Sequence, residues 1–221
     1  MNEEAHGENG EGMRRVARPY AVVVGVLFLA VVVYAGINSV SNKPLGLEPG
    51  TRAPKFAAPS ATGTLDGDAN VNPTRACQVR GKDVVNICQY SHRPVVLTVW
   101  FSRCGGHCEP QLDRVERIRS HFPGVAFLGL DVRDSLEKAR KAVLRHAWGF
   151  PMAVDRDGAV SSLYGVVVGP TTFFIYPRAG SAETGVIRKV VRHEIDDRTL
   201  TAEVKALVAA SRKRERAGRR G

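Results

Sequence analysis

The chain has 221 residues, which is enough for one sizeable domain with short appendages. Its contents of hydrophobic and charged residues, 43% and 24%, are ordinary for a globular protein. The net charge of +10 has no nucleic-acid-binding motif beside it, so it does not indicate DNA or RNA binding.

An apolar segment at residues 20–37 predicts a transmembrane helix. The segment holds 18 residues without a charge or a strong polar group. As a helix it would extend over about 27 Å, close to the hydrocarbon thickness of a bilayer. Tyr20 and Tyr34 lie towards its ends, where aromatic rings suit the membrane interface.

The charges on either side of this segment predict its orientation. Residues 1–19 would be cytoplasmic and the rest of the chain extracytoplasmic, because three arginines precede the apolar segment: Arg14, Arg15 and Arg18. The alternative is a cleaved signal peptide, with Val33-Tyr34-Ala35 as an acceptable cleavage site, although signal peptides usually have a shorter apolar region. Both interpretations export the domain, and the first makes the protein a single-pass cell-membrane protein with a signal anchor.

The remaining boundaries follow from composition. Residues 38–55 are interrupted by prolines and glycines and are interpreted as a linker. The domain is predicted over residues 56–210. Residues 211–221 are interpreted as a solvated basic tail, with attraction to nucleic acid, anionic lipid or an acidic wall polymer as the alternative.

The first two of the four cysteines, Cys77 and Cys88, bracket a predicted hairpin. Gly81-Lys82-Asp83 lies midway between two β-prone runs, and a turn there would place the two cysteines opposite each other, within disulfide reach. Such a bridge closes a loop of about 12 residues and would stabilise the domain by roughly 3 kcal/mol. We interpret it as structural, with a redox role as the alternative.

Strands and helices are predicted to alternate after this hairpin. Apolar runs predict strands, and apolar residues at spacings of three and four predict helices. The predicted strands are 94–101, 125–132, 171–176 and 186–191, and the predicted helices are 110–122, 135–146 and 199–210. This order indicates an α/β fold with a mixed sheet flanked by helices.

The second cysteine pair, Cys104 and Cys108, follows the first predicted core strand directly and precedes a helix. Reaction sites of open α/β sheets gather at that edge, and a helix N-terminus stabilises a thiolate. Arg103 and His107 would add to this effect if they point at the sulfur atoms. The two glycines between the cysteines let the backbone close a disulfide. A purely structural bridge is the alternative, but a five-residue loop constrains little of the unfolded chain.

The sequence resembles the TlpA/ResA-type thioredoxin-fold family, also called redoxins, over about residues 50–210. WFSRC, which includes Trp100, is similar to the family's WxSxC run. FPMAVDRDGAVSSLYGVVVGPTTFFIYPRAG resembles its second half, with Asp155, Tyr164-Gly165-Val166 and Pro170 in the family's order. The resemblance implies that Pro170 follows a cis peptide bond and packs beside the cysteine pair.

The chain departs from the family at the site itself. The cysteine spacing is C-x-x-x-C rather than C-x-x-C, and Arg103 stands where the family often has Trp. The longer spacing also resembles Sco-type copper chaperones, since two thiolates suit Cu(I). Those proteins add a distant histidine just before the strand that corresponds to 171–176, where this chain has Gly169-Pro170, and His107, His121, His146 and His193 lie elsewhere.

Two further alternatives are a peroxidase and a non-catalytic binding domain. A peroxiredoxin needs a threonine three residues before its reactive cysteine, whereas Phe101 precedes Cys104 and Gly105 precedes Cys108. This makes peroxidase chemistry the weaker interpretation. The binding-domain alternative stays open, since a chain can keep the fold without the chemistry.

The resemblance implies an extracytoplasmic thiol-disulfide oxidoreductase. Cys104 would form the mixed disulfide with a client and Cys108 would resolve it. The implied partners are exported proteins with thiols or disulfides and a redox protein that recharges the pair, and no metal or organic cofactor is implied.

Overall fold

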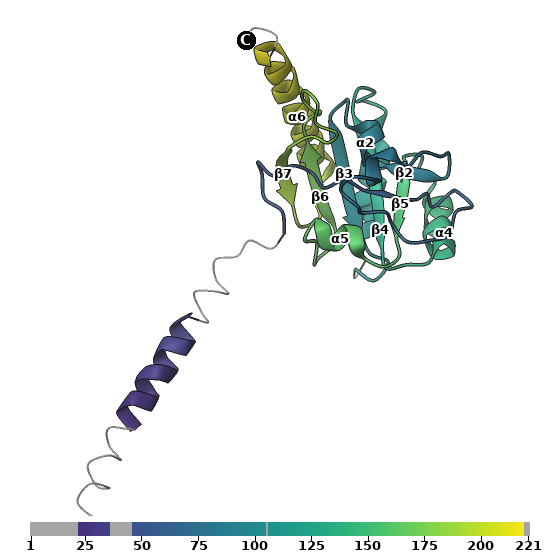
Figure 1. Cartoon of the computed structure of the whole chain (residues 1–221). Coiled ribbons are helices and arrows are strands. Elements are labelled where there is room, and N and C mark those ends of the chain that lie inside the picture. The colour runs from purple at the N-terminus through teal and green to yellow at the C-terminus, as the bar shows by residue number, and fades with distance from the viewer. Residues whose placement is uncertain (1–21, 36–45, 105, 219–221) are drawn as a thin grey trace, which may run out of the picture. The chain divides into compact units, whose positions relative to one another are not determined.

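The computed structural model describes residues 22–35, 46–104 and 106–218. The chain forms two compact units, Met1–Pro44 and Leu45–Gly221. The first contains a helix over residues 22–35 (Figure 1). The predicted membrane helix of residues 20–37 extends past this range at both ends, and the predicted cytoplasmic segment lies outside the described residues. Within the ranges described, no helix has the length and apolar character that a membrane crossing requires.

The second unit is built on a five-stranded sheet in the order β5-β4-β3-β6-β7 (Figure 1). Strands β3, β4 and β5 are mutually parallel, while β6 is antiparallel to β3 and β7 is antiparallel to β6. The strands are β3 (Val95–Trp100), β4 (Ala126–Val132), β5 (Met152–Asp155), β6 (Thr171–Ile175) and β7 (Ile187–Val191). Every residue of β3 and β4 is buried, because both faces of the sheet are covered.

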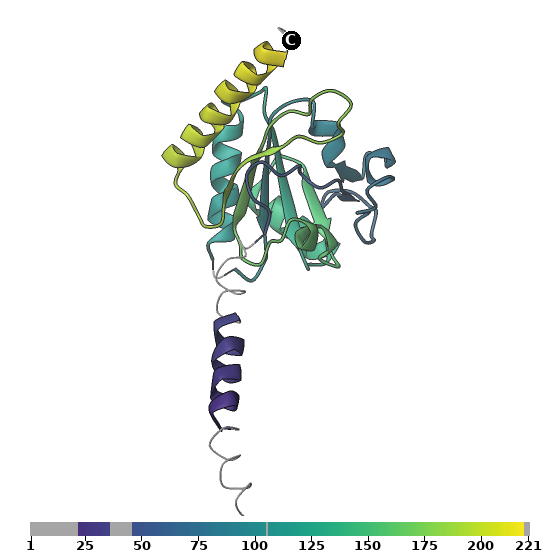
Figure 2. The ribbon, with the colours of Figure 1, turned by 60° about the vertical axis from the view of Figure 1, so that its left-hand side comes forward.

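Helices cover one face of the sheet, and a mixed layer covers the other. The first face packs against α3 (Cys108–Arg119), α4 (Leu136–His146) and α6 (Asp197–Gly218). Helices α3 and α6 contact each other on this face (Figure 2). The opposite face packs against α5 (Ala159–Leu163), α2 (Ile87–Tyr90) and the two-stranded sheet of β1 (Ala57–Pro59) and β2 (Val84–Asn86). The predicted mixed sheet flanked by helices is therefore confirmed.

Local sequence signals explain the ends of α4 and the start of α5. Ser135 caps α4, since its hydroxyl accepts the Lys138 N–H at 3.3 Å. Ala147 ends this helix in the left-handed conformation, at φ 53°. Asp155 begins the turn into α5 by accepting the Val160 and Ser161 N–H groups at 3.0 and 2.8 Å.

The predicted hairpin around Gly81-Lys82-Asp83 is wrong. Cys77 lies in the short 3₁₀ helix η1 (Ala76–Gln78) and Cys88 lies in α2. The intervening strand β2 pairs with β1, so the backbone hydrogen bonds expected across the hairpin are made with residues far upstream. Helix α6 also continues through Gly218, into the segment interpreted as a tail, because its Lys and Arg side chains favour a helix C-terminus.

Candidate functional site

A disulfide joins Cys104 and Cys108 where β3 gives way to α3. The Cα atoms are 6.0 Å apart and the sulfur atoms are bonded at 2.04 Å. The chain turns between them, and the His107 N–H donates to the Cys104 carbonyl oxygen at 3.3 Å. Since β3 ends at Trp100 and α3 begins at Cys108, the disulfide lies at the carboxyl edge of the parallel strands.

The two cysteines differ in exposure. Cys108 is 1% exposed, whereas Cys104 is only partly buried. Gly169 lies directly against Cys108, because a Cβ atom built on it would be 3.0 Å from the Cys108 Sγ and 2.6 Å from the Phe101 ring. Cys108 is thus covered from the side of β6, and Cys104 is the cysteine that a second protein can reach.

The N-terminus of α3 lies at the disulfide. His107 is the residue before the first turn, and its side chain makes no capping hydrogen bond there. The first-turn N–H groups therefore leave a partial positive charge beside Cys108, and the bonded Cys104 sulfur shares this environment. Such a field favours the thiolate over the thiol when the disulfide is reduced.

Trp100 and Arg103 lie in different environments, although they are only three positions apart in the sequence. Trp100 is 1% exposed, packs edge-on against Trp148 with ring centroids 5.4 Å apart, and donates from Nε1 to the Met152 sulfur at 3.2 Å. It supports the site from inside the core. Arg103 is exposed and makes no hydrogen bond or ion pair with the residues that the structure describes.

His107 is turned towards the loop between β7 and α6. Its Nδ1 lies 3.0 Å from the Glu194 carboxylate, which also pairs with Arg114. Hydrogen bonds from Arg114 and, to a smaller extent, from His107 lower the pKa of the Glu194 carboxyl. The side-chain Oε1 of Gln111 accepts the Ile195 N–H at 2.9 Å. Glu194 and Gln111 thus tether the start of α3, and no local sequence pattern indicates these contacts because the partners are 80 or more residues apart.

Pro170 follows a cis peptide bond after Gly169 and is buried at the start of β6. The contact of Gly169 with the Cys108 sulfur brings this segment to the disulfide. Val167 and Val168, the two residues before Gly169, are 65% and 46% exposed. An apolar surface therefore lies in the segment next to the cysteine pair.

A buried carboxyl group lies under the loop that leads to the disulfide. Asp131 pairs with Trp100 in the parallel ladder, is 0% exposed, and has no hydrogen-bond partner for either carboxyl oxygen among the described residues. Burial, and then the nearby Asp134, raise its pKa to about 8. Asp134 in turn accepts the Ser102 N–H at 3.3 Å. The sequence signal for this group is the one acid inside the apolar run VAFLGLDV.

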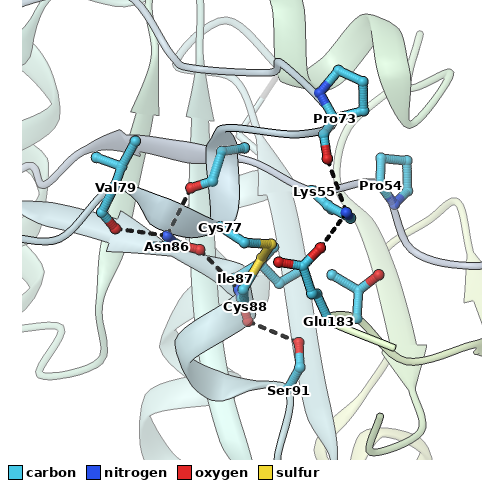
Figure 3. The surroundings of a disulfide bond; sticks show 12 residues. Pro54, Lys55, Pro73, Cys77, Val79, Asn86, Ile87, Cys88, Ser91 and Glu183 are labelled. Atoms are coloured by element: carbon cyan, nitrogen blue, oxygen red, sulfur yellow. Dashed lines mark hydrogen bonds and ion pairs between the residues drawn. A yellow bond between two sulfur atoms is a disulfide. The ribbon is translucent and has the colours of Figure 1, made fainter. Parts of the chain in front are cut away.

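The other disulfide joins Cys77 and Cys88, with Cα atoms 5.5 Å apart, and Asn86 organises its surroundings (Figure 3). The Asn86 Nδ2 donates to the carbonyl oxygens of Ala76 and Val79 at 2.9 and 2.8 Å, and its Oδ1 accepts the Cys88 N–H at 2.9 Å. This buried side chain therefore connects η1 to α2 on both sides of the sulfur atoms.

Replacing both Cys77 and Cys88 with Ser is expected to lower the free energy of unfolding by about 3 kcal/mol, because the unfolded chain regains the entropy of an open loop. The exchange chemistry of the folded protein is expected to stay within about twofold of wild type, since the bridge lies in the layer on the opposite face of the sheet from α3. Urea unfolding and a thiol-exchange assay measure the two quantities. Loss of exchange at unchanged stability would assign this pair a redox role.

The described residues contain no cluster of three or more His, Cys, Asp or Glu side chains arranged to hold a metal ion. Cys104 and Cys108 supply two sulfur ligands at most. A third ligand from position 169 is excluded by the contact of Gly169 with Phe101 and Cys108, which leaves no room for a side chain.

Comparison with known proteins places this site in a family. The model of the AhpC/TSA family matches residues 49–180, which include both cysteine pairs and Pro170. Among curated proteins, none matches the chain in sequence.

Solved structures show the same fold at low sequence identity. A thiol:disulfide interchange protein DsbE of Chlorobium tepidum is 21% identical with a TM-score of 0.57, covering 73% of this chain and 99% of its own. A secreted thiol-disulfide isomerase of Corynebacterium glutamicum is 18% identical with a TM-score of 0.55, covering 76% and 95%. A secreted disulfide oxidoreductase of Mycobacterium tuberculosis is 18% identical with a TM-score of 0.51, covering 68% and 94%. The fold is thus thioredoxin-like, and the chain belongs to the AhpC/TSA family.

Proposed function

We propose that the protein is a thiol-disulfide oxidoreductase of the TlpA/ResA type, which exchanges disulfides with client proteins through Cys104 and Cys108. The observation that carries this proposal is the unequal exposure of the two cysteines at one helix N-terminus. An accessible sulfur bonded to a covered one is the arrangement that a two-step exchange needs.

In the reducing direction, the Cys104 thiolate attacks one sulfur of a client disulfide. The client S–S bond breaks, a mixed disulfide forms at Cys104, and the first client sulfur leaves as a thiolate that takes a proton from water. Cys108 then loses its proton and attacks the Cys104 sulfur, which releases the second client thiolate. The client gains two electrons and the pair loses two, and a separate thiol-disulfide protein restores them. The oxidising direction is the same sequence reversed.

The client is held beside Cys104 by the segment that precedes Pro170. Exposed Val167 and Val168 offer an apolar surface there, so clients with apolar side chains next to a cysteine would bind best. The close fit of Gly169 against Cys108 fixes the distance of this surface from the disulfide.

Gly169→Ala tests this fit. The new Cβ would lie 2.6 Å from the Phe101 ring and 3.0 Å from the Cys108 sulfur, so one of these groups must move. We expect a loss of about 1–3 kcal/mol in stability, as for overpacked cores, and a slower exchange reaction. Gly67→Ala is the matched control, since a Cβ there meets nothing within 4 Å. Equal behaviour of the two variants in urea unfolding and exchange assays would contradict the role given to Gly169.

We further propose that the N-terminal apolar segment anchors the protein in the cell membrane, with the domain on the extracytoplasmic side. The large apolar side chains of the 22–35 helix support this, since Val22, Leu27, Phe28 and Leu29 are 61–70% exposed to solvent. A helix that is apolar all round is stable in a hydrocarbon environment. The arginines before it support the orientation.

External protease on intact cells, followed by fractionation, tests this topology. We expect a membrane-bound protein whose domain is digested from outside. A full-length soluble product, or a domain protected on the cytoplasmic side, would contradict the proposal. A shortened soluble product would favour the cleaved signal peptide.

Reduced full-length protein carrying Cys77→Ser and Cys88→Ser, incubated with oxidised glutathione, tests the exchange reaction itself. We expect one glutathione adduct, at Cys104, that disappears as the Cys104–Cys108 disulfide forms. A pair that forms no adduct and reacts no faster than ordinary exposed cysteines would favour a non-catalytic binding domain, and tight binding of Cu(I) by the same pair would favour a copper chaperone.

A further inference from the structure

A cavity of about 790 Å³ lies at the end of the sheet opposite the disulfide. Its walls include Pro94 and Val125, which precede β3 and β4, and Tyr176, which follows β6. The second half of α6, drawn in yellow in Figure 2, forms another wall, from Ser211 to Gly218. Since the cysteines follow the other end of β3, about 20 Å of strand separates the cavity from the thiol chemistry.

The charges around the cavity are mostly positive. Four arginines line it, namely Arg93, Arg178, Arg212 and Arg214, together with the single acid Glu215. None of these four arginine side chains forms an ion pair with a carboxylate among the described residues. Several arginines on other surfaces are paired, as in Arg117–Asp197 at 2.8 Å, Arg156–Asp68 at 3.0 Å and Arg192–Glu48 at 3.0 Å.

Two of the four arginines differ in how their guanidinium groups are held. The Arg93 Nε is buried and has no acceptor among the described residues, although buried donors are nearly always paired. The Arg214 guanidinium lies over the Tyr176 ring, 4.5 Å from its centroid. Stacking on an aromatic ring covers the face of a guanidinium and leaves the N–H groups at its edge free for an acceptor.

Part of the cavity wall is apolar, although His92, His121 and Ser211 also line it. Phe122, Pro123, Pro177 and Val208 line the cavity beside Tyr176. A volume of this size is typical of sites for small organic ligands, which combine apolar walls with a few polar groups that fix orientation. A bare inorganic anion would satisfy the arginines but would leave these walls exposed to water.

We infer that this cavity binds a small, free organic anion, with a phosphate or carboxylate group on the arginines and an aromatic or aliphatic body against the apolar walls. Guanidinium groups bind both kinds of anion through paired hydrogen bonds. The site is separate from the cysteine pair and does not depend on the exchange reaction. It also assigns a role to the basic end of α6. Composition alone allowed two interpretations of this end, a solvated tail or a general attraction to polyanions.

Titration calorimetry on the full-length protein in phosphatidylcholine nanodiscs, with empty nanodiscs as blank, tests the inference. Naphthyl phosphate combines both ligand features, whereas inorganic phosphate lacks the apolar body and naphthol lacks the charge. We expect naphthyl phosphate to bind with a stoichiometry of one per chain. Its affinity should be at least about tenfold higher than that of either control. Equal affinity for inorganic phosphate and naphthyl phosphate would show an adventitious ion only and would overturn the inference.

Arginine variants locate the binding. Arg178→Gln and Arg214→Gln are each expected to weaken naphthyl phosphate binding by about tenfold. Arg198→Gln is the matched control, since Arg198 is an exposed arginine on the first turn of α6, at the helix end away from the cavity. All three variants should keep the wild-type exchange rate, which shows that they fold. If the cavity variants bind naphthyl phosphate normally and lose only association with phosphatidylglycerol vesicles, these arginines serve a membrane surface and the inference is wrong.

Discussion

Replacing Cys108 with Ser is expected to turn the protein into a trap for its clients. Cys104 keeps its exposure and its place beside the N-terminus of α3, so it still attacks a client disulfide. Without the Cys108 thiol the mixed disulfide is not resolved and accumulates. Non-reducing gels of cells that express the variant, followed by mass spectrometry of the adducts, should show client proteins bound through Cys104.

Cys104→Ser is the matched control for this experiment. Cys108 is 1% exposed and lies against Gly169, so we expect this variant to form at least about tenfold fewer adducts than Cys108→Ser. Both variants should carry Cys77→Ser and Cys88→Ser, so that one cysteine remains in each. Equal trapping by the two would mean that the longer C-x-x-x-C loop opens enough to expose either sulfur, and a higher yield from Cys108 would reverse the assigned roles.

The free energy of unfolding is expected to fall as pH rises from about 5 to about 8, and Asp131→Asn is expected to remove this fall. The pKa of Asp131 is raised to about 8 in the folded protein, against about 3.9 in the unfolded chain. Between these values the folded state holds a proton that the unfolded state has lost. Stability therefore decreases by up to about 1.4 kcal/mol per pH unit, or about 3.6 kcal/mol over this range.

Urea unfolding at several pH values measures this effect. The asparagine side chain has nearly the same shape and cannot ionise, so the variant should gain stability relative to wild type as pH rises. Glu137→Gln is the control, since Glu137 is an exposed acid on the first turn of α4. A stability difference between Asp131→Asn and wild type that is independent of pH would show that Asp131 is already ionised in the folded protein.

Much of the fold could be predicted because its elements carry strong local patterns. The apolar runs that became β3 and β4, and the periodic run that became α3, were located to within two residues or so at most ends. Pairing between segments distant in sequence was missed, since the β-prone run that became β2 was assigned to a hairpin instead. Strands β1 and β2 have three residues each, and they form only because they pair with each other across the intervening segment, which contains Cys77. A run of three residues has no periodicity to detect.

The site could be predicted in part for the same reason. The strand-to-helix junction placed Cys104 and Cys108, and the family resemblance pointed to Pro170. The side chains around them were harder, because their orientation is decided by tertiary contacts. His107 turns to Glu194, Trp100 points into the core, and Arg103 stays in solvent. These side-chain orientations do not follow from a position near a cysteine in the sequence.

The equilibrium of the Cys104–Cys108 pair with glutathione tests the central proposal most directly. The full-length protein with Cys77→Ser and Cys88→Ser is equilibrated in buffers of graded glutathione potential, and the two thiols are quantified by alkylation. An exchanging pair should titrate reversibly between about −120 and −270 mV, the range of known thiol-disulfide oxidoreductases. A pair that stays oxidised to below about −300 mV would be a structural bridge, and the proposed exchange function would be wrong.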